Sequence, residues 1–431
     1  MIKLVDWSLS DANTKDSALL RNKAVEDMQL AKDVAGIIQE VALRGDAALF
    51  ACAEKFDKVK LESLVVTDDE YSVLDTFDEK YKLAIQAAYK NIYDYHSKSV
   101  PAEFGYAQNE IWLGKQYRPI DKVGLYIPGG TATLVSTLMM LAIPANIAGC
   151  KTKVLVTPPM QNGNIAPAIL FAAKYCGIDT VYKVGGAQAI AALAYGTETI
   201  PKVHKIFGPG NKYVTEAKLQ VSNSKIAQVA IDMPAGPSEV LVIGDATANP
   251  EFIASDLLAQ AEHDVDAQVI LVTVSRELAS KVLVHLQLQL EYLSRKNVIK
   301  QSLSKSSIII TDTLEECFNI SNLYAPEHLI LHIKNADDYL DKIHNAGSVF
   351  VGEWTPEALG DYASGTNHVL PTYGYANMYS GLDVGSFMKA ISFQKATPNG
   401  LLAIGNTVER LAELEGLDAH KNAVSIRLQG L

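Results

Sequence analysis

A glutamate and a histidine stand side by side in the stretch LYAPEHLIL, residues 323–331. The apolar residues after them predict a buried strand, and the proline before them restricts how the chain enters it. Neighbouring side chains of a regular strand point to opposite faces, but at an irregular entrance both can turn toward one cavity. An imidazole can then remove a proton while a carboxylate activates water. Glu327 and His328 thus predict a reaction with two deprotonations, and the alternative is an ordinary surface pair.

A second group of side chains has the chemistry of metal ligands. Gln260 and His263 lie three residues apart on a predicted helix in LLAQAEHD, so their side chains share a face. An amide oxygen and an imidazole nitrogen can both bind zinc, which takes about four ligands. This pair alone is weak evidence, because such residues are more often on the surface or packed in the core. The metal hypothesis is strengthened by polar residues in two other unusual segments, which are Asp361 and His368 in GDYASGTNH and Glu415 and His420 in EGLDAH.

Three glycine-rich turns follow predicted strands. They are YIPGG (126–130), VGGAQA (184–189) and FGPGN (207–211), and the last two open predicted helices. Free N–H groups and the helix dipole at such turns favour an anionic or strongly polar ligand. Turns at the carboxyl ends of neighbouring parallel strands face one crevice, so together they predict a nucleotide-like ligand. Each turn alone could be simple strand-to-helix geometry, and the chain has no complete G-x-G-x-x-G fingerprint at these turns.

The other histidines and the cysteines predict no chemistry. One histidine, His285, lies on an amphipathic helix, and four lie in charged surroundings, so we interpret all five as solvated or packed residues; the four are His96, His204, His332 and His344. The four cysteines lie far apart without a CxxC pair, which favours buried reduced thiols over disulfides or a thiolate metal site. They are Cys52, Cys150, Cys176 and Cys317. The alternative of Cys150 as a nucleophile is the weaker one.

Length, composition and charge restrict the class of protein. The chain has 431 residues, of which 48% are hydrophobic and 20% charged, enough for a large core and about three compact units. It carries 38 Lys and Arg against 49 Asp and Glu, a formal net charge of -11, without a basic run, which excludes nucleic acid as an expected partner. We find no basic-then-apolar start and no apolar run of about 20 residues. We therefore expect a soluble cytoplasmic protein that does not enter a membrane.

The order of predicted elements indicates an α/β protein. Apolar residues recur at helical spacing over 24–56, with a break at RGD, and again over 78–98. From about residue 120 short β-branched runs alternate with helical segments, in one series up to about 221 and in a second from 238 to 353. This alternation predicts two α/β units with mostly parallel sheets covered on both faces. The Gly-, Pro- and Tyr-rich stretch 354–383 predicts a functional loop, and 397–428 predicts a helical arm with an exposed strand.

Several long motifs, in order and spacing, resemble the histidinol dehydrogenase family from the first helices to the last residues. They are YIPGG, VGGAQAIAALAYGT, KIFGPGN, IDMPAGPSEVLVI, SDLLAQAEHD, YAPEHL, AGSVFVG, GDYASGTNHVLPT and EGLDAHKNAV. The resemblance implies a zinc-dependent homodimeric enzyme of histidine biosynthesis, with one zinc per subunit. Such an enzyme oxidises L-histidinol through the aldehyde to L-histidine with two NAD and one water. We hypothesise that His328 removes protons in both oxidations and that Glu327 activates water in the second.

The resemblance assigns roles to particular residues by motif. It implies that the zinc ligands are Gln260, His263, Asp361 and His420. It implies that Glu327 and His328 are catalytic and that Tyr126, Gln188 and Asn211 contact NAD. The substrate contacts that it implies are Ser238, His368 and Glu415, together with the zinc ligands and His328. One departure is Asp264 in EHDVDAQ, where the family leads us to expect a small residue such as glycine after His263.

Together, pattern and resemblance predict two Rossmann-like three-layer domains with a helical N-terminal segment and a C-terminal dimerisation arm. The predicted ranges are 1–23 for the helical segment, 24–125 with 235–375 for the main domain, 126–234 for an inserted NAD-binding domain, and 376–431 for the arm. The main domain would hold the metal and catalytic residues. The arm would cross to the partner, so that Glu415 and His420 complete the other subunit's site.

Two other functions use many of the same residues. A metal-dependent dehydrogenase for another small polar alcohol would keep zinc and the Glu-His pair while changing the groups around the substrate. His368 and Glu415 favour histidinol, because they suit a cationic substrate that carries an imidazole. A nucleotide-binding regulatory protein with a purely structural metal belongs to a different class. Formation of reduced nicotinamide from histidinol and NAD separates all three.

Overall fold

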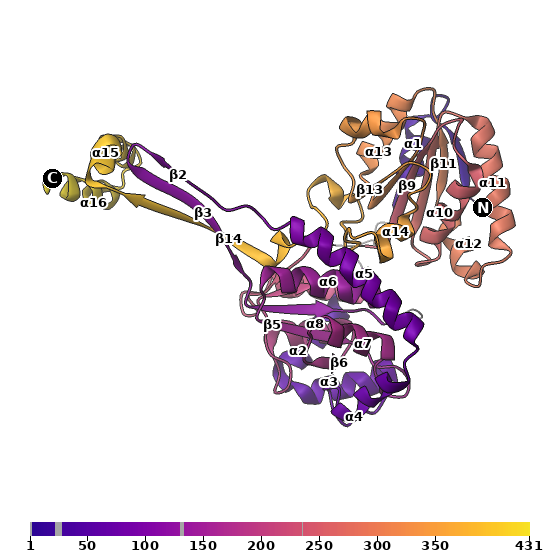
Figure 1. Ribbon diagram of the computed structural model, residues 1–431, viewed down its shortest axis with the longest axis horizontal. Coiled ribbons are helices and arrows are strands. Elements are labelled where there is room, and N and C mark those ends of the chain that lie inside the picture. Colours follow the sequence, from indigo (N-terminus) through magenta and orange to yellow (C-terminus); the bar gives the residue numbers. More distant parts are fainter. Residues whose placement is uncertain (1, 22–27, 130–132, 235) are drawn as a thin grey trace.

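The computed structural model describes residues 2–21, 28–129, 133–234 and 236–431. The chain forms two α/β lobes and a long arm that reaches away from both (Figure 1). Each lobe contains one parallel sheet, and the arm contains a three-stranded antiparallel sheet. This arrangement confirms the predicted α/β class with two mostly parallel sheets.

The lower lobe in Figure 1 is built on a five-stranded sheet with the order β6-β5-β4-β7-β8. Its strands are β4 (Lys122–Tyr126), β5 (Thr152–Thr157), β6 (Val181–Lys183), β7 (Lys205–Phe207) and β8 (Ala230–Ile231). The helices between them are α6 (Val135–Ala148), α7 (Pro167–Tyr175), α8 (Gly186–Tyr195) and α9 (Lys212–Ser222). The sheet order reverses between β4 and β7, the type of position at which open α/β sheets bind ligands.

Helices from the first hundred residues complete this lobe. They are α2 (Met28–Arg44), α3 (Asp46–Cys52), the π-helix η1 (Ala53–Asp57), α4 (Asp68–Tyr71), the 3-10 helix η2 (Ser72–Thr76) and α5 (Glu79–Lys98). Val34, Ile38 and Val41 of α2 share one face and are buried in a core with α8 and α9. Ile85 and Ile92 of α5 are buried on the other face of the sheet, with α6 and α7.

The packing of these helices differs from the predicted domain boundaries. We expected residues 24–125 to join 235–375 in one domain, but α2 and α5 cover the five-stranded sheet of the predicted inserted unit. The amphipathic pattern requires each helix to bury one face, and it does not specify against which sheet. The predicted boundary at 23 and 24 and the residue Ala235 lie outside the described residues.

The upper lobe is built on a six-stranded parallel sheet with the order β1-β11-β10-β9-β12-β13. Its strands are β1 (Lys3–Asp6), β9 (Glu239–Gly244), β10 (Gln268–Thr273), β11 (Ser307–Ile310), β12 (His328–His332) and β13 (Ser348–Val351). Its helices are α1 (Ala12–Leu19), α10 (Pro250–Ala261), α11 (Arg276–Leu290), α12 (Lys296–Ser304), α13 (Leu314–Tyr324), the 3-10 helix η3 (Ala336–Lys342) and α14 (Glu357–Tyr362). Every residue of β9, β10 and β12 is buried, as their continuous apolar runs predict.

We expected residues 1–23 to be helical, but this N-terminal segment also contains a strand. Lys3–Asp6 form β1, which pairs in parallel with β11 at the edge of the six-stranded sheet, and only then does α1 begin. Asp11 caps α1 by accepting a hydrogen bond from the Thr14 N–H. A four-residue edge strand is too short to produce a clear alternating pattern in the sequence.

The arm combines segments from two distant parts of the chain. It consists of β2 (Phe104–Gln108), β3 (Ile111–Pro119), β14 (Met388–Ala396), α15 (Pro398–Leu414) and α16 (Asp418–Gln429). β14 pairs with β3 along nine residues of each strand. The predicted strand within 397–428 is wrong, because α15 and α16 occupy that range and the exposed strand β14 precedes it. We also did not anticipate that β2 and β3 belong to the arm.

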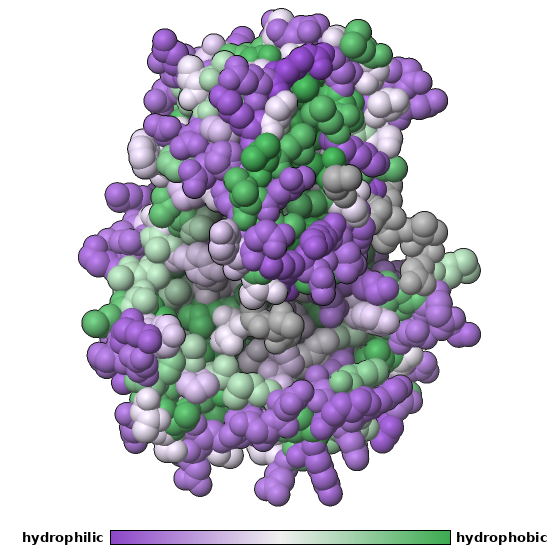
Figure 2. Space-filling view, turned by 90° about the vertical axis from the view of Figure 1, so that its right-hand side faces the viewer, coloured by the Kyte–Doolittle hydropathy of each residue, from purple (hydrophilic) through white to green (hydrophobic). Residues whose placement is uncertain are grey.

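The predicted loop 354–383 contains α14, the 3-10 helix η4 (Tyr375–Asn377) and otherwise irregular backbone, and η5 (Gly385–Phe387) follows it. The side of the molecule in Figure 2 is largely hydrophilic, with a hydrophobic strip on the upper lobe. Among the described helices, none combines the length and apolar character that crossing a membrane demands.

Candidate active site

The Glu-His pair lies at the amino end of β12. Ala325 after α13 takes a left-handed conformation, with a φ of 51°, so the chain turns sharply through Pro326 before the strand begins. The Glu327 carboxylate accepts a hydrogen bond from the Glu239 N–H at 2.8 Å. His328 Nδ1 lies 3.1 Å from the Glu239 carbonyl oxygen and 3.6 Å from Glu327 Oε2. Both side chains therefore turn toward one place, as the irregular entrance predicts.

The contacts of His328 define its chemistry. A carbonyl oxygen can only accept, so the hydrogen bond to Glu239 places the ring proton on Nδ1 and leaves Nε2 as the basic nitrogen. Burial lowers the pKa of His328 to about 3, so the ring is neutral near pH 7. Nε2 lies 3.7 Å from Asp361 Oδ1. A neutral imidazole with its basic nitrogen facing the polar cluster can accept a proton.

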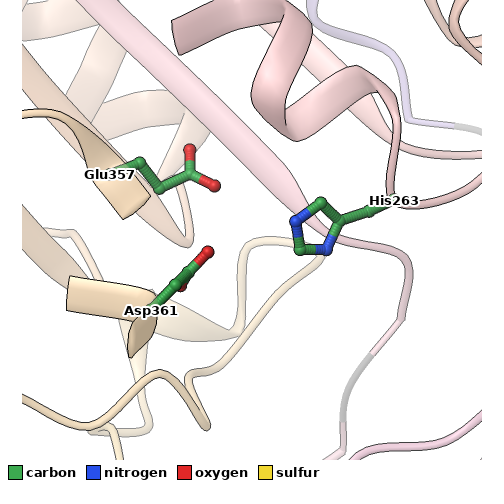
Figure 3. Close-up of side chains that lie close together, drawn as sticks. All are labelled: His263, Glu357 and Asp361. Carbon is green, nitrogen blue, oxygen red and sulfur yellow. The ribbon is translucent and has the colours of Figure 1, made fainter. Parts of the chain in front are cut away.

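Next to this pair, three side chains form a cluster of the kind that binds metal ions. The ligand atoms of His263, Glu357 and Asp361 all lie within 4.8 Å of one another, and Figure 3 shows the three side chains pointing toward a common space. His263 follows the end of α10 and is exposed, whereas the two carboxylates on α14 are buried. Gln260, in the last turn of α10, places its amide against the Glu357 carboxylate. The amide orientation that satisfies both groups has the nitrogen donating to both carboxylate oxygens, at 2.9 Å for Oε2.

Glu357 is a site residue that our reading of the sequence missed. It stands four residues before Asp361 on α14, so both carboxylates share one helix face. That spacing was visible in PEALGD and could have indicated a second carboxylate beside the predicted ligand. We had treated the segment as an irregular loop, in which spacing does not define a common face.

The electrostatics of the cluster favour a cation. Burial raises the pKa of Glu357 well above its usual range, with the nearby carboxylates of Asp361 and Glu327 adding to the shift. Burial also raises the pKa of Asp361 to about 7 and that of Glu327 well above its ordinary value. Like charges this close cannot all ionise without compensation. A divalent cation would supply that compensation, and the oxygen and nitrogen donors present are types that zinc can bind.

His368 connects the cluster to the other lobe. Its Nδ1 lies 2.8 Å from the Asp361 carbonyl oxygen, and its Nε2 lies 3.1 Å from Thr137 Oγ1 on α6. The neighbouring Asn367 donates to the Met140 carbonyl oxygen of α6 and contacts His96 of α5. The loop that carries Asp361 and His368 is thus held against helices of the five-stranded lobe. The site lies where the two lobes meet.

Two predicted site residues are not near this cluster within one chain. Glu415 is the C-cap residue that follows α15, His420 lies on α16, and both are exposed. Both helices lie at the far end of the arm, away from both lobes (Figure 1). The chain alone therefore brings together Gln260, His263 and Asp361 but not His420. Ser238 immediately precedes β9, beside Glu239, and its carbonyl oxygen accepts from the Gln268 N–H at 3.2 Å.

The three predicted cofactor contacts line one pocket of about 1050 Å³ in the five-stranded lobe. Tyr126 ends β4, Gln188 lies in the first turn of α8, and Asn211 caps α9 by accepting from the Tyr213 and Val214 N–H groups. All three glycine turns contribute lining residues, which confirms their predicted convergence; Gly130 of the first turn lies outside the described residues. The sequence did not reveal that side chains before β4 also line the pocket, among them Asp33, Phe56 and Asp57.

The turn after β7 is held by a buried ion pair. Gly208 has a φ of +122°, and a Cβ atom there would collide with the Tyr126 carbonyl oxygen, so only glycine fits. Asp232 accepts from the Gly208 N–H at 2.8 Å, and Lys218 donates to the Gly208 carbonyl oxygen at 2.9 Å. Lys218 and Asp232 also pair with each other, and both side chains are buried. These contacts keep Asn211 at the rim of the pocket.

The remaining histidines and cysteines lie outside this machinery. His204 and His344 are exposed, His285 is half-buried, and His332 is buried on β12, 2.9 Å from Asp256. Cys150, Cys176 and Cys317 are buried as expected, whereas Cys52 is only partly buried. Burial raises the pKa of Cys150 to about 11, which argues against a nucleophilic thiol. Asp264 is exposed and closes a turn by accepting from the Asp266 N–H at 2.9 Å.

A doubly wound α/β protein with a nucleotide-type pocket in one lobe and an acid-base pair beside a candidate metal site in the other has the features of a dehydrogenase. The sequence model of the histidinol dehydrogenase family matches residues 20–428. The chain belongs to the histidinol dehydrogenase family.

Individual relatives agree with this assignment over the full length. The chain is 50% identical to histidinol dehydrogenase from Vibrio vulnificus strain CMCP6 over 432 residues, covering 100% of this chain and 99% of the relative. It is 51% identical to histidinol dehydrogenase from Vibrio cholerae, with the same coverage. A crystal structure of histidinol dehydrogenase from Elizabethkingia anophelis matches with a TM-score of 0.95 and 46% identity, covering 100% of this chain and 98% of that one.

Proposed function

We propose that this chain oxidises L-histidinol to L-histidine through the aldehyde, with two NAD and one water, in the last steps of histidine biosynthesis. Membership of the histidinol dehydrogenase family supports the reaction class. The observation that carries the proposal is the placement of Glu327 and His328, 3.6 Å apart, with the His328 ring 3.7 Å from Asp361 of the metal-type cluster. A four-electron oxidation needs both a base and activated water at one carbon, and this arrangement provides groups for each.

Zinc fits the residues that the chain presents. Gln260, His263 and Asp361 would hold it, and Glu357 adds a buried carboxylate within the same cluster. The C-terminal end of α10, which carries Gln260, has a negative partial charge that also favours a cation. When bound, zinc would supply a fixed positive charge that orients the polar groups of the substrate and lowers the pKa values of the surrounding carboxyl groups.

His328 and Glu327 would divide the proton chemistry between them. His328 Nε2 would take the hydroxyl proton as the first hydride leaves, because Nδ1 is already bonded to the Glu239 carbonyl oxygen. Glu327 would take a proton from the water that attacks the aldehyde, its carboxylate oriented by the Glu239 N–H. After passing the first proton to solvent, His328 would take a proton from the resulting hydrate during the second hydride transfer.

The five-stranded lobe would bind NAD. The pocket lies at the carboxyl ends of β4, β5, β6 and β7, where the N-termini of α8 and α9 favour phosphate groups. Tyr126 and Gln188 are buried in its wall, while Asn211 stands at its exposed rim. NAD would accept each hydride. The pocket and the six-stranded lobe would thus divide cofactor and substrate binding.

The arm would complete a homodimer with shared active sites. It exposes large apolar side chains on both its strands and its helices, among them Phe104, Tyr106, Leu402, Leu414 and Ile426. Such surface is characteristic of an interface. We propose that Glu415 and His420 reach the partner's site, where His420 would add a zinc ligand and Glu415 and His368 would contact the substrate, with Ser238.

The direct test is to mix the protein with histidinol and NAD and to count the NADH that forms. Two equivalents of NADH per histidinol are expected, whereas one equivalent would indicate a simple alcohol dehydrogenase and none would contradict the proposal. Glu327→Gln should lower the oxidation of supplied aldehyde by ~100- to 10,000-fold and the first oxidation less. Equal losses in single-turnover assays of the two halves would refute the role of Glu327.

A further inference from the structure

The backbone of Glu239 contacts both members of the catalytic pair. Its N–H donates to the Glu327 carboxylate at 2.8 Å, and its carbonyl oxygen accepts from the His328 ring at 3.1 Å. Glu239 begins β9, the strand next to β12 in the sheet. A displacement of the Glu239 backbone would therefore move both Glu327 and His328.

The side chain of Glu239 is held by an arginine from the N-terminal segment. Arg21 Nε donates to Glu239 Oε1 at 2.5 Å, and its Nη2 donates to Oε2 at 3.0 Å, a bidentate pair. The pair is almost completely removed from solvent, with exposed fractions of 14% for Arg21 and 2% for Glu239. Two parallel hydrogen bonds between planar groups restrict rotation as well as distance.

Arg21 is itself fixed against the helix that precedes the catalytic pair. Its Nη2 donates to the Tyr324 carbonyl oxygen at 2.6 Å, and its guanidinium lies 3.7 Å from the centre of the Tyr324 ring. Tyr324 is the last residue of α13, three residues before Glu327. Its hydroxyl donates to Gln268 at 2.7 Å, so this ring cannot shift freely. Arg21 thus joins both segments that approach the catalytic pair, the start of β9 and the end of α13.

A third segment reaches the same carboxylate. The Tyr373 N–H donates to Glu239 Oε1 at 3.1 Å, and Tyr373 lies just beyond the loop that carries Asp361 and His368. All these partners come from distant parts of the chain, and they converge on the Glu239 carboxylate. A buried ion pair is a costly way to obtain stability alone, because both charges lose their hydration. A role in holding the Glu239 backbone in place accounts for the buried, bidentate Arg21–Glu239 ion pair.

We propose that Arg21 and Glu239 are positioning residues that align Glu327 and His328 through the backbone N–H and carbonyl groups of Glu239. The inference rests on the proposed function, since it assumes that this pair is catalytic. Neither side chain contacts the metal-type cluster or the cofactor pocket directly in the described contacts. Loss of the pair should therefore lower turnover in both oxidations while leaving substrate, NAD and zinc binding unchanged.

The experiment compares variants of Arg21 with a matched control in the full-length protein. Arg21→Met removes the charge and both hydrogen bonds, and Arg21→Lys keeps the charge but not the planar fork. The control is Arg276→Met, because Arg276 pairs with Asp6 of the same N-terminal segment but is exposed and remote from β12. The measurements are kcat and KM for both oxidations, zinc content, NAD affinity, and the folded fraction by circular dichroism.

For Arg21→Met we expect kcat per folded enzyme to fall in both oxidations, by up to ~100-fold, with KM and zinc content unchanged. Arg21→Lys should recover part of the loss. The loss in both halves distinguishes this effect from Glu327→Gln, which mainly impairs the second. If Arg21→Met does not fold, the double variant Arg21→Met with Glu239→Gln tests the positioning role instead, because it leaves no buried charge unpaired.

Values for Arg21→Met, or for the double variant, that equal those of Arg276→Met in both oxidations would overturn the positioning role. That result, together with the expected loss in Glu327→Gln, would leave the proposed function intact. If histidinol and NAD give no NADH with the unaltered protein, the proposed function fails, and the inference fails with it.

Discussion

Both lobes are parallel α/β sheets, yet their candidate sites lie at opposite ends of the strands. The carboxyl edge and the amino edge of a sheet are the sides at which its strands end and begin. In the five-stranded lobe the pocket lies at the carboxyl ends of the strands, beyond Tyr126 of β4. In the six-stranded lobe the acid-base pair lies at the amino ends, where Glu239 begins β9 and His328 begins β12. In both lobes the positions flank the reversal of strand order, between β4 and β7 or between β9 and β12. The fold provides two edges, and each lobe uses a different one.

The polarity of the helices gives a physical reason for this difference. At the carboxyl edge the chain enters helices, so the N-termini of α8 and α9 present free N–H groups and partial positive charge. At the amino edge the chain leaves helices, so the end of α10 presents carbonyl groups and partial negative charge beside Gln260 and His263. One edge suits a phosphate-bearing ligand and the other a cation. The choice of edge therefore sets the charge of the ligand.

Removal of the metal should have the largest effect on activity, and this effect should be confined to the site at the amino ends of the strands. Chelation is expected to lower histidinol oxidation by about 1,000-fold, because a metal contributes several kcal/mol of transition-state stabilisation, and added zinc should restore it. NAD affinity of the chelated protein, measured by calorimetry, should stay as it was. Full activity in metal-free protein would contradict the cation site, and lost NAD binding would contradict the separation of the two edges.

Substitution of Glu357 tests whether the cluster at the amino edge is built for a cation. Glu357→Gln keeps the shape but weakens the hold on Gln260, and we expect zinc affinity to fall by about 10- to 100-fold in competition with a chelator. The matched control is Glu353→Gln, which alters an exposed carboxylate just before the same helix. Equal zinc affinity in the two variants would show that Glu357 does not support the metal site.

The contact between the lobes should make stability depend on pH in the metal-free protein. Burial lowers the pKa of His96 to about 4, while an unfolded histidine has a pKa near 6.5, so between these values only the unfolded chain binds the proton. The free energy of unfolding should therefore fall as the pH drops from 6.5 toward 4. One such group contributes about 1.4 kcal/mol per pH unit.

Urea unfolding at several pH values measures this slope. His96→Gln should reduce it, because the variant has no proton to gain on unfolding at that position. His204→Gln, at an exposed position in the same lobe, should leave the slope unchanged. The same slope in His96→Gln and in the unaltered protein would mean that His96 is not held neutral between the lobes.

The smallest expected effect concerns the helix N-terminus at the carboxyl edge. Asn211→Ala removes the cap of α9, which accepts from two N–H groups, and should lower stability by ~1 kcal/mol. If the same free-energy loss lowers NAD binding, NAD affinity should fall about fivefold, and zinc affinity should not change. Asn223→Ala, at the other end of the same helix, is the control. A change in zinc affinity, or an equal effect of both variants on NAD binding, would contradict the assignment of NAD to this edge.

Sequence patterns predicted the local features of the site well. The alternation of apolar runs and helical segments gave both parallel sheets, and Pro326 before a buried run indicated the irregular entrance at Glu327 and His328. The three glycine turns indicated a common pocket, which Tyr126, Gln188 and Asn211 line. These features depend on short-range backbone geometry, which residue type and spacing largely determine.

Features that depend on packing between distant segments escaped this reading. The apolar faces of α2 and α5 could pack against either sheet. Only the assembled cores show that both helices cover the five-stranded sheet. β3 lies about 270 residues before β14, the strand with which it pairs, so this pairing leaves no local signal in the sequence. Glu357 and Arg21 were missed for the same reason, because their importance lies in what they contact and not in the residues beside them.

By itself, the sequence indicated most of the candidate site residues and the alternating strands and helices of both parallel sheets, because φ and ψ preferences, caps and apolar spacing act within a few residues. Only the tertiary structure decided that His263, Glu357 and Asp361 meet, that the end of α10 faces them, and that Arg21 reaches Glu239 across 218 positions. Such contacts between distant residues depend on how the helices pack against the two sheets. That burial is a property of the whole chain, since apolar surface has no intrinsic partner until the layers pack together.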